Sequence, residues 1–303
     1  MSKGRSFALV WCIINMLMLL SFLTPLIIIT INFVMVPTLV LFARLELKKA
    51  LLFYAISIAA VSALTGFTGM FLVLMSLFFL VPGIVMSRLY KKELAARSVI
   101  VAGTVTLLGE FLLGLLVGYA VGFRPMERLK EFIQSSVDSL PEVLRNSVNQ
   151  TALDLAIHYF MQIIPLLLIT AALFYTMIGH VVGRWVLRRN GMPVKGLAPI
   201  REWMLPRSMV LYLVIVTIFD MFISIESNSF FSMVVWNLLP ILTMAFTVQA
   251  ISFLFFVSHA KKWTVALPVV AIVLVAVLPF LVYIYCIMGM LDVLLPIRKR
   301  IAG

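Results

Sequence analysis

Residues 97–122 read RSVIVAGTVTLLGEFLLGLLVGYAVG and carry one acidic residue and no basic residue after Arg97. A helix needs about 20 mostly apolar residues to cross the hydrocarbon core of a bilayer, and apolar runs of this length recur along the chain. Of the 303 residues, 63% are hydrophobic and 12% are charged, whereas soluble domains are about 45–50% apolar. The sequence therefore predicts an integral membrane protein and excludes the soluble enzyme classes.

The predicted spans lie between charged clusters and turn residues. They cover residues 6–23, 25–43, 48–66, 68–88, 97–122, 156–187, 207–225 and 230–258. A further apolar run, 263–297, is too long for one ordinary span, and Pro279 lies near its middle, so it is either one kinked helix or a hairpin of two. The predicted fold class is all-α, a polytopic membrane helical bundle with about nine or ten transmembrane segments.

Lysine and arginine predict the orientation. Cytoplasmic loops of membrane proteins are enriched in these residues, and most of the 24 basic residues fall on one side if the spans alternate. We therefore expect a cytoplasmic amino terminus, a cytoplasmic loop 188–206 and an outer segment 124–154. A hairpin at Pro279 would also place the basic tail, residues 298–300, inside, which favours ten spans and leaves nine as the alternative.

The net charge of +12 is distributed over separate clusters beside the predicted spans. Such clusters attract anionic lipid headgroups, so the bilayer is the expected partner and nucleic acid is not. The sequence has no phosphate loop, metal-ligand spacing or catalytic triad in a supporting context. We expect no cofactor, no metal and no enzymatic activity, and energy for any transport would come from an ion gradient or a separate energising protein.

Three regions follow from this pattern: an N-terminal five-span half (1–122), an outer amphipathic segment (123–155) and a C-terminal membrane half (156–303). In the middle region, apolar residues recur at spacings of three and four, the period of a helix with one apolar face. They are Met126, Leu129, Ile133, Val137, Leu140 and Leu144. Pro141 would divide this helix into two pieces, forming an interfacial connector, which we favour, or a lid over a ligand site.

Glu110 is a carboxylate near the centre of a predicted span. A charge at that depth costs about 2.5–3.5 kcal/mol on insertion scales, so such a residue usually faces a partner, a cavity or a proton path. Gln249 lies in another predicted span, and its convergence with Glu110 would create a polar pocket. Both are candidate residues of a solute or proton site. The alternative is that both make structural hydrogen bonds between helices.

Glycines repeat every fourth residue on two predicted spans. Gly114, Gly118 and Gly122 do so on the fifth span, and Gly179 and Gly183 on the sixth. Small residues at this spacing allow another helix to approach closely. We expect both stripes to be helix-packing contacts.

Two stretches resemble YybS-type bacterial membrane proteins, a family of unknown function. One is the loop 197–206, LAPIREWMLP, which contains Pro199, Trp203 and Pro206; the other is GMLD at 289–292, followed by RKR at 298–300. The resemblance implies a multi-pass protein of the bacterial plasma membrane.

That family is in turn similar, in its opening spans, to S-components of energy-coupling-factor vitamin transporters, which dock on a separate ATP-driven module. In this chain the likeness rests on the paired opening spans, the basic turn 44–49 and the small-residue turn 65–69. The leading hypothesis is S-component-like binding or transport of a small solute at Glu110 and Gln249, with residues 124–154 near the entrance. The alternative is a non-catalytic scaffold or assembly factor that works through helix–helix contacts.

Overall fold

The structure is a computed structural model that describes residues 2–142, 145, 149–223, 229–295 and 297–302, and every regular element in these ranges is a helix. Within these ranges, six helical runs are long and apolar enough to cross a bilayer: Ile27–Arg44, Leu47–Thr65, Gly69–Lys91, Ala96–Ala120, Ile164–Arg189 and Phe230–Ala260. Four shorter apolar helices in the same described ranges cover Ser6–Ser21, Ser208–Asp220, Ala266–Val277 and Leu281–Leu294. The predicted all-α membrane fold is confirmed.

The chain forms two compact units. The first comprises Met1–Pro125 and Leu168–Leu197, and the second comprises Met126–Leu167 and Ala198–Gly303. This division differs from the predicted halves, because most of the helix Ile164–Arg189 joins the N-terminal helices instead of the C-terminal ones. Each unit is described separately below.

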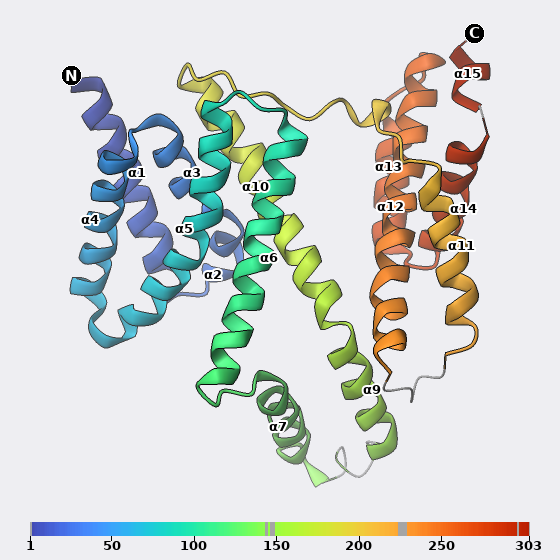
Figure 1. Cartoon of the computed structure of the whole chain (residues 1–303), viewed down its shortest axis with the longest axis horizontal. Helices are drawn as coiled ribbons and strands as arrows, with labels where there is room; N and C mark the ends of the chain where they lie inside the picture. The colour runs from blue at the N-terminus through green and yellow to red at the C-terminus, as the bar shows by residue number, and fades with distance from the viewer. Residues whose placement is uncertain (1, 143–144, 146–148, 224–228, 296, 303) are drawn as a thin grey trace. The chain divides into compact units, whose positions relative to one another are not determined.

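The first unit is a bundle of helices that lie side by side, drawn from blue to green in Figure 1 together with the yellow α10. It contains α1 (Ser2–Ser21), α2 (Ile27–Thr30), η1 (Ile31–Phe33), α3 (Met35–Arg44), α4 (Leu47–Thr65), η2 (Gly66–Thr68), α5 (Gly69–Lys91), α6 (Ala96–Ala120) and most of α10 (Ile164–Arg189). The chain turns between Ser21 and Ile27, so the break predicted at Thr24 and Pro25 is confirmed. Residues 35–43 of α3 are all buried, which places α3 at the centre of this unit.

Two glycines of α10 explain why this helix packs in the first unit. A Cβ atom built on Gly183 would lie 2.6 Å from Leu39 Cδ2, and one built on Gly179 would overlap Met35 Cε. Side chains of α3 therefore occupy the space that larger residues of α10 would fill, and the two helices approach closely. Gly179 and Gly183 make the kind of contact that their spacing predicts.

Hydrogen bonds between buried side chains also join the helices of this unit. In a membrane interior such bonds connect helices because no water is present to satisfy the polar groups. The pairs are Asn15 with Ser57, Tyr54 with the Ser76 carbonyl, Thr104 with Thr176 and Tyr90 with His180, at 2.7–2.9 Å. These contacts connect α1 with α4, α4 with α5, α6 with α10 and α5 with α10.

The other glycine stripe does not meet a helix among the described residues. A Cβ on Gly114 would have no neighbour within 4 Å there, and one on Gly118 would contact only Phe123, just beyond the end of the same helix. Gly122 lies outside α6 and has φ +81°. Its N–H binds the Tyr119 carbonyl, and the Phe123 N–H binds the Gly118 carbonyl. This is the Schellman arrangement, which favours glycine because of its left-handed backbone, so Gly122 ends α6 instead of extending the stripe.

The second unit contains eight helical segments within the described residues. They are α7 (Pro125–Asp138), α9 (Gln150–Gln162), η3 (Ile200–Glu202), α11 (Ser208–Asp220), α12 (Phe230–Ala260), α13 (Ala266–Val277), α14 (Leu281–Leu294) and α15 (Ile297–Ala302). The run 263–297 breaks at residues 278–280, and α14 turns back to pack along α12 (Figure 1). This confirms the hairpin interpretation, because Pro279 lacks the N–H group that would continue the helix.

Helix α14 packs against α12 at very short range. A Cβ on Gly289 would overlap the Phe246 carbonyl oxygen and lie 3.0 Å from the Ala250 nitrogen. The hydrogen at Gly289 therefore allows the two backbones to meet. This contact holds the end of α14 beside the middle of α12.

The helix expected from residue 156 onward begins at Ile164 in the structure, because α9 ends at Gln162. In a continuous helix the Leu166 N–H would bind the Gln162 carbonyl. Instead, Asn237 of α12 accepts from the Leu166 N–H at 2.6 Å and donates to the Gln162 carbonyl at 2.7 Å. Pro165 further weakens this turn because it has no N–H. The break is thus one of the kinks made when a side chain enters the helical hydrogen-bond ladder.

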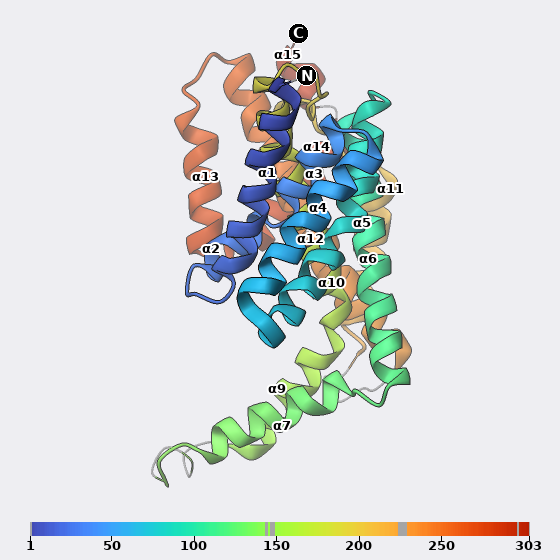
Figure 2. The same cartoon turned by 90° about the vertical axis from the view of Figure 1, so that its left-hand side faces the viewer.

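The outer amphipathic segment is present as α7, whose Leu129, Ile133 and Val137 are half-buried while most of its charged residues are exposed. The helix ends at Asp138, shortly before Pro141, as expected. Leu140, also in the predicted stripe, is exposed and lies beyond the end of α7, and the side chains of Met126 and Leu144 lie outside the described residues. Most of the second predicted piece, after Pro141, lies outside the described residues, and the next described helix is α9; Figure 2 shows α7 and α9 at the same end of the chain.

Candidate functional site

Glu110 lies on α6 in the first unit and is half-buried. Its Oε2 atom is buried and has no hydrogen-bond partner among the described residues. The adjacent Phe111 packs on Phe78 with ring centroids 5.0 Å apart, and Leu107, one turn earlier, is completely buried. A buried polar atom without a partner costs about 1–3 kcal/mol. Glu110 therefore remains a candidate functional residue, because a function would explain why an unfavourable buried group is present.

Gln249 lies on α12 in the second unit and is 2% exposed. Its Oε1 atom accepts from the Leu205 N–H at 3.0 Å, and its Nε2 atom donates to Asp292 Oδ2 at 2.5 Å. Both ends of the amide are therefore bound within the second unit. Gln249 therefore makes the structural hydrogen bonds that the alternative interpretation expects, and a polar pocket shared with Glu110 stays a prediction.

The partner of Gln249 belongs to a buried ion pair. Arg298 Nη2 lies 2.7 Å from Asp292 Oδ2, and Arg298 Nε lies 3.0 Å from Oδ1. The Asp292 side chain is 0% exposed and that of Arg298 is 13% exposed. A planar guanidinium that holds both carboxylate oxygens is a strong, directional contact. The pair joins the end of α14 to α15.

Further bonds attach this pair to α12 and to the loop 197–206. Arg298 donates through Nη1 to the Arg201 carbonyl at 2.8 Å and through Nη2 to Ser252 Oγ at 3.1 Å. Ser252 in turn donates to the Trp203 carbonyl at 2.8 Å. We call Gln249, Ser252, Asp292 and Arg298 the polar cluster. These side chains supply one another's hydrogen-bond partners, so the cluster has a structural role: it attaches the loop to the helices.

The loop residues singled out in the sequence have backbone roles. Pro199 directly precedes η3, and Pro206 lies just before α11. The Trp203 indole donates to the Ala198 carbonyl at 2.9 Å. The loop and the chain ending, which carried the family resemblance separately, therefore meet at the polar cluster. Sequence analysis did not identify Asp292 and Arg298 as partners; the signal was an acid inside an apolar run, six residues before an arginine.

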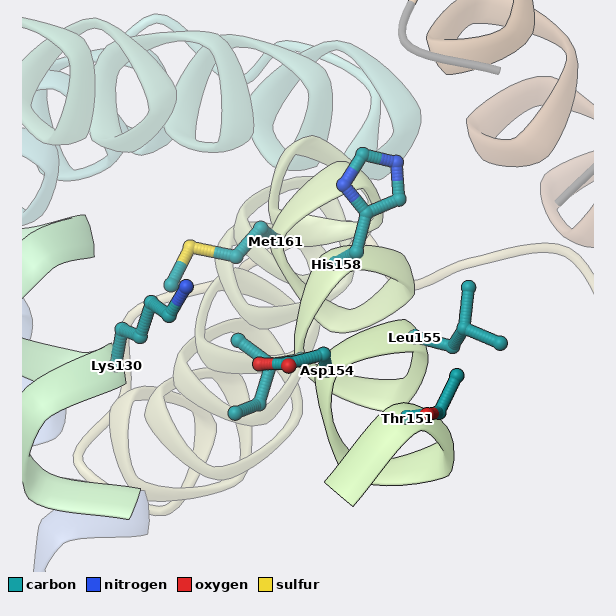
Figure 3. A pocket seen from close by; sticks show the side chains of 7 residues that line it. Lys130, Thr151, Asp154, Leu155, His158 and Met161 are labelled. Atoms are coloured by element: carbon teal, nitrogen blue, oxygen red, sulfur yellow. The ribbon is translucent and has the colours of Figure 1, made fainter. Parts of the chain in front are cut away.

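A pocket of about 540 Å³ lies between α7 and α9, in the outer amphipathic segment of the second unit. Its lining is formed by Lys130, Thr151, Asp154, Leu155, Ile157, His158 and Met161. Figure 3 shows Lys130 on one helix facing Asp154 and Met161 on the other. Neither Glu110 nor Gln249 lines it, so this is not the pocket expected from the sequence.

The pocket combines opposite charges with apolar residues. Lys130 and Asp154 are exposed, whereas Ile157 is buried. His158 is half-buried, and its Nε2 atom lies 2.7 Å from Gln162 Nε2. An ammonium group, a carboxylate and a hydroxyl from Thr151 can hold a small solute that carries both a positive and a negative group. The sequence signal was one charged residue on each of two amphipathic pieces, without any indication that they face each other.

These features define a polytopic α-helical membrane protein in which the loop before α11 is fastened to the carboxyl-terminal helices. The model of the family "Predicted membrane protein (DUF2232)" matches residues 12–293, and the chain belongs to this family. It is similar to the uncharacterized protein YybS of Bacillus subtilis (strain 168), with 23% identity over 273 residues, 88% of this chain and 87% of that protein. No solved structure matches the chain. The resemblance to YybS-type proteins is thereby confirmed.

Proposed function

We propose that this protein binds a small polar solute at the outer face of the bacterial plasma membrane and serves its transport, in the manner of an S-component, without catalysing a reaction. The observation that carries the proposal is the pocket between α7 and α9, with Lys130 and Asp154 on opposite walls. Its volume of about 540 Å³ lies within the range of about 300–1,000 Å³ typical of small-molecule sites. The charges favour a zwitterionic solute such as an amino acid.

The test is ligand-dependent stabilisation of the purified protein. A solute that binds only the folded state raises the free energy of unfolding by about 2.7 kcal/mol at 100 times its Kd, which a thermal-shift screen of zwitterionic solutes detects. Asp154→Asn and Lys130→Gln should each abolish the shift. Arg128→Gln is the matched control, because Arg128 lies on α7, pairs with Glu131 at 3.1 Å and does not line the pocket. Equal shifts in all variants would refute the proposal.

Glu110 would supply ion coupling in this proposal. The support is its buried oxygen without a hydrogen-bond partner among the described residues. Glu110→Gln keeps the size and the hydrogen-bonding capacity but removes ionisation, so solute binding should persist while pH-dependent uptake into proteoliposomes disappears. Full pH-dependent uptake by Glu110→Gln would exclude Glu110 from the coupling step.

The proposed orientation places the pocket outside and the loop 188–206 in the cytoplasm, as the positive-inside rule favours. Single cysteines at Ser135 and Lys195, in a chain lacking Cys12 and Cys286, test it in intact cells. An impermeant reagent should label position 135 and spare position 195. The reverse pattern would overturn the orientation.

The second candidate function is a membrane scaffold that binds another protein through its helices. The open space beside Gly114, bordered by exposed Leu113 and Val117, favours it, because small residues on a membrane helix admit a close partner. A separate energising protein would use the same surface. Gly114→Leu should then reduce co-purification of a partner from the native membrane without changing the stability of the chain; unchanged co-purification would argue against this surface.

A further inference from the structure

A second pocket lies at the end of the second unit where η3, the end of α12 and the start of α13 meet. Its volume is about 490 Å³, and none of its lining residues belongs to the α7–α9 pocket or to the polar cluster, which adjoins it through the Arg201 carbonyl. We call it the basic groove. Its lining includes two cations, Arg201 and Lys262, together with His259. No acidic residue is among its described lining residues, although Glu202 approaches Arg201 from outside at 3.9 Å.

Ser258 is an independent indication of a ligand. The residue is 3% exposed and lines the groove, and its Oγ atom is buried without a hydrogen-bond partner among the described residues. Buried hydroxyl groups normally have a partner, and each exception calls for an explanation. A ligand oxygen in the groove would accept the hydrogen bond that Ser258 can donate.

The groove also has an apolar lining. It consists of Ile200, Phe255 and Pro268, together with Trp263, which is 51% exposed. Lys261 Nζ lies 5.3 Å from the centre of the Trp263 ring. Tryptophan and lysine at the end of a membrane helix are typical of the headgroup level of a bilayer. The groove therefore offers positive charge and a hydroxyl donor beside a surface suited to acyl chains.

We propose that the basic groove binds one anionic phospholipid, with its phosphate between Arg201 and Lys262 and accepting from Ser258, and its acyl chains against Phe255 and Trp263. An arginine suits this task because its planar group contacts two phosphate oxygens. The mixed lining favours a lipid over a free phosphate ion, which has no apolar part. The proposal concerns the lipid bound by the protein and does not depend on the solute pocket.

The experiment is native mass spectrometry of delipidated full-length protein titrated with phosphatidylglycerol, phosphatidylcholine or inorganic phosphate. One phosphatidylglycerol should bind more tightly than phosphatidylcholine and resist displacement by phosphate. A basic residue beside an anionic lipid contributes about fivefold in affinity, so Arg201→Gln with Lys262→Gln should weaken binding about 30-fold. Ser258→Ala should weaken it by a smaller factor, and Arg207→Gln, a neighbouring exposed cation outside the groove, should not.

Three outcomes would overturn the proposal. Equal affinity for phosphatidylcholine would remove the role of charge, and displacement by inorganic phosphate would identify a free-anion site. Unchanged phosphatidylglycerol binding by the double variant and by Ser258→Ala would place the lipid elsewhere. Arg201 and Lys262 are not buried, so the double variant is expected to fold; if its unfolding temperature falls, Ser258→Ala alone decides the result, because the loss of one unpartnered hydroxyl leaves no broken bond in the protein.

Discussion

Replacing Asp292 with alanine removes the carboxylate through which α14 holds Arg298 and Gln249. The guanidinium of Arg298 then loses its counter-charge, and the Gln249 amide loses a hydrogen-bond acceptor at 2.5 Å. Their remaining partners are the Arg201 carbonyl and Ser252 for Arg298, and the loop backbone for Gln249. The substitution should therefore loosen the loop 197–206 from the carboxyl-terminal helices while leaving the first unit intact.

The burial of the pair sets the expected magnitude. Removing one partner of a buried ion pair costs about 3–5 kcal/mol, because the other charge remains without compensation. The Asp292 side chain is fully buried, but that of Arg298 is 13% exposed and can regain some hydration. We therefore expect a loss of about 3 kcal/mol in the free energy of unfolding, at the lower end of that range.

The assay is a denaturant titration in mixed micelles, followed by tryptophan fluorescence. Glu46→Ala is the matched control, because Glu46 and Lys49 form an ion pair at 2.9 Å whose side chains are 77% and 64% exposed. Exposed pairs contribute only about 0–1 kcal/mol. Asp292→Leu combined with Arg298→Met should recover most of the loss, since apolar replacement of a whole buried pair is often neutral or stabilising.

Two results would refute this reasoning. One is a loss for Asp292→Ala no larger than the loss for Glu46→Ala. The other is a double variant as unstable as Asp292→Ala, which would mean that the uncompensated charge is not the source of the cost.

Three further predictions use the same titration. Asn237→Leu should lower the free energy of unfolding by about 1–3 kcal/mol, because two backbone groups at the α9–α10 break lose their partner. A loss below about 0.5 kcal/mol would contradict the bridging role. Gly289→Leu should lower the free energy of unfolding by about 1–3 kcal/mol, because the new side chain would overpack against the Phe246 carbonyl. Unchanged stability would mean that α14 does not approach α12 this closely. Gly179→Leu should be similarly destabilising, whereas Gly114→Leu should change the free energy of unfolding by no more than about 0.5 kcal/mol. Equal losses for these two variants would contradict the different surroundings of the two glycine stripes.

The parts of the fold that could be predicted are those decided over short distances in sequence. About 20 consecutive apolar residues are enough to favour a membrane helix, so the long helices were evident. The breaks near Pro25 and Pro279 were also evident, because a missing backbone N–H acts locally. By contrast, Gln162 and Pro165 stand beside Ile163 in an otherwise apolar run, but the bridge at this break comes from Asn237, 71 positions after Leu166.

The candidate site depended more on tertiary structure, which short patterns do not specify. Gly114 and Gly179 belong to similar stripes, yet only Gly179 has a helix of the described chain against it. Gln249 was recognisable as a polar residue in a span, but its partner Asp292 is 43 positions away. The pocket between Lys130 and Asp154 likewise depends on how α7 and α9 fold back on each other.

The two hydrogen bonds of Asn237 also imply an order of events during synthesis. The ribosome completes α9 and α10 well before residue 237, so the nascent chain has only its own backbone or water to satisfy the Gln162 carbonyl and the Leu166 N–H. Pro165 already removes one backbone hydrogen bond from that turn. The turn between α9 and α10 therefore lacks these bonds until α12 enters the membrane. The Gln162 carbonyl and the Leu166 N–H therefore gain their partner late, from a helix that the translocation machinery receives only afterwards.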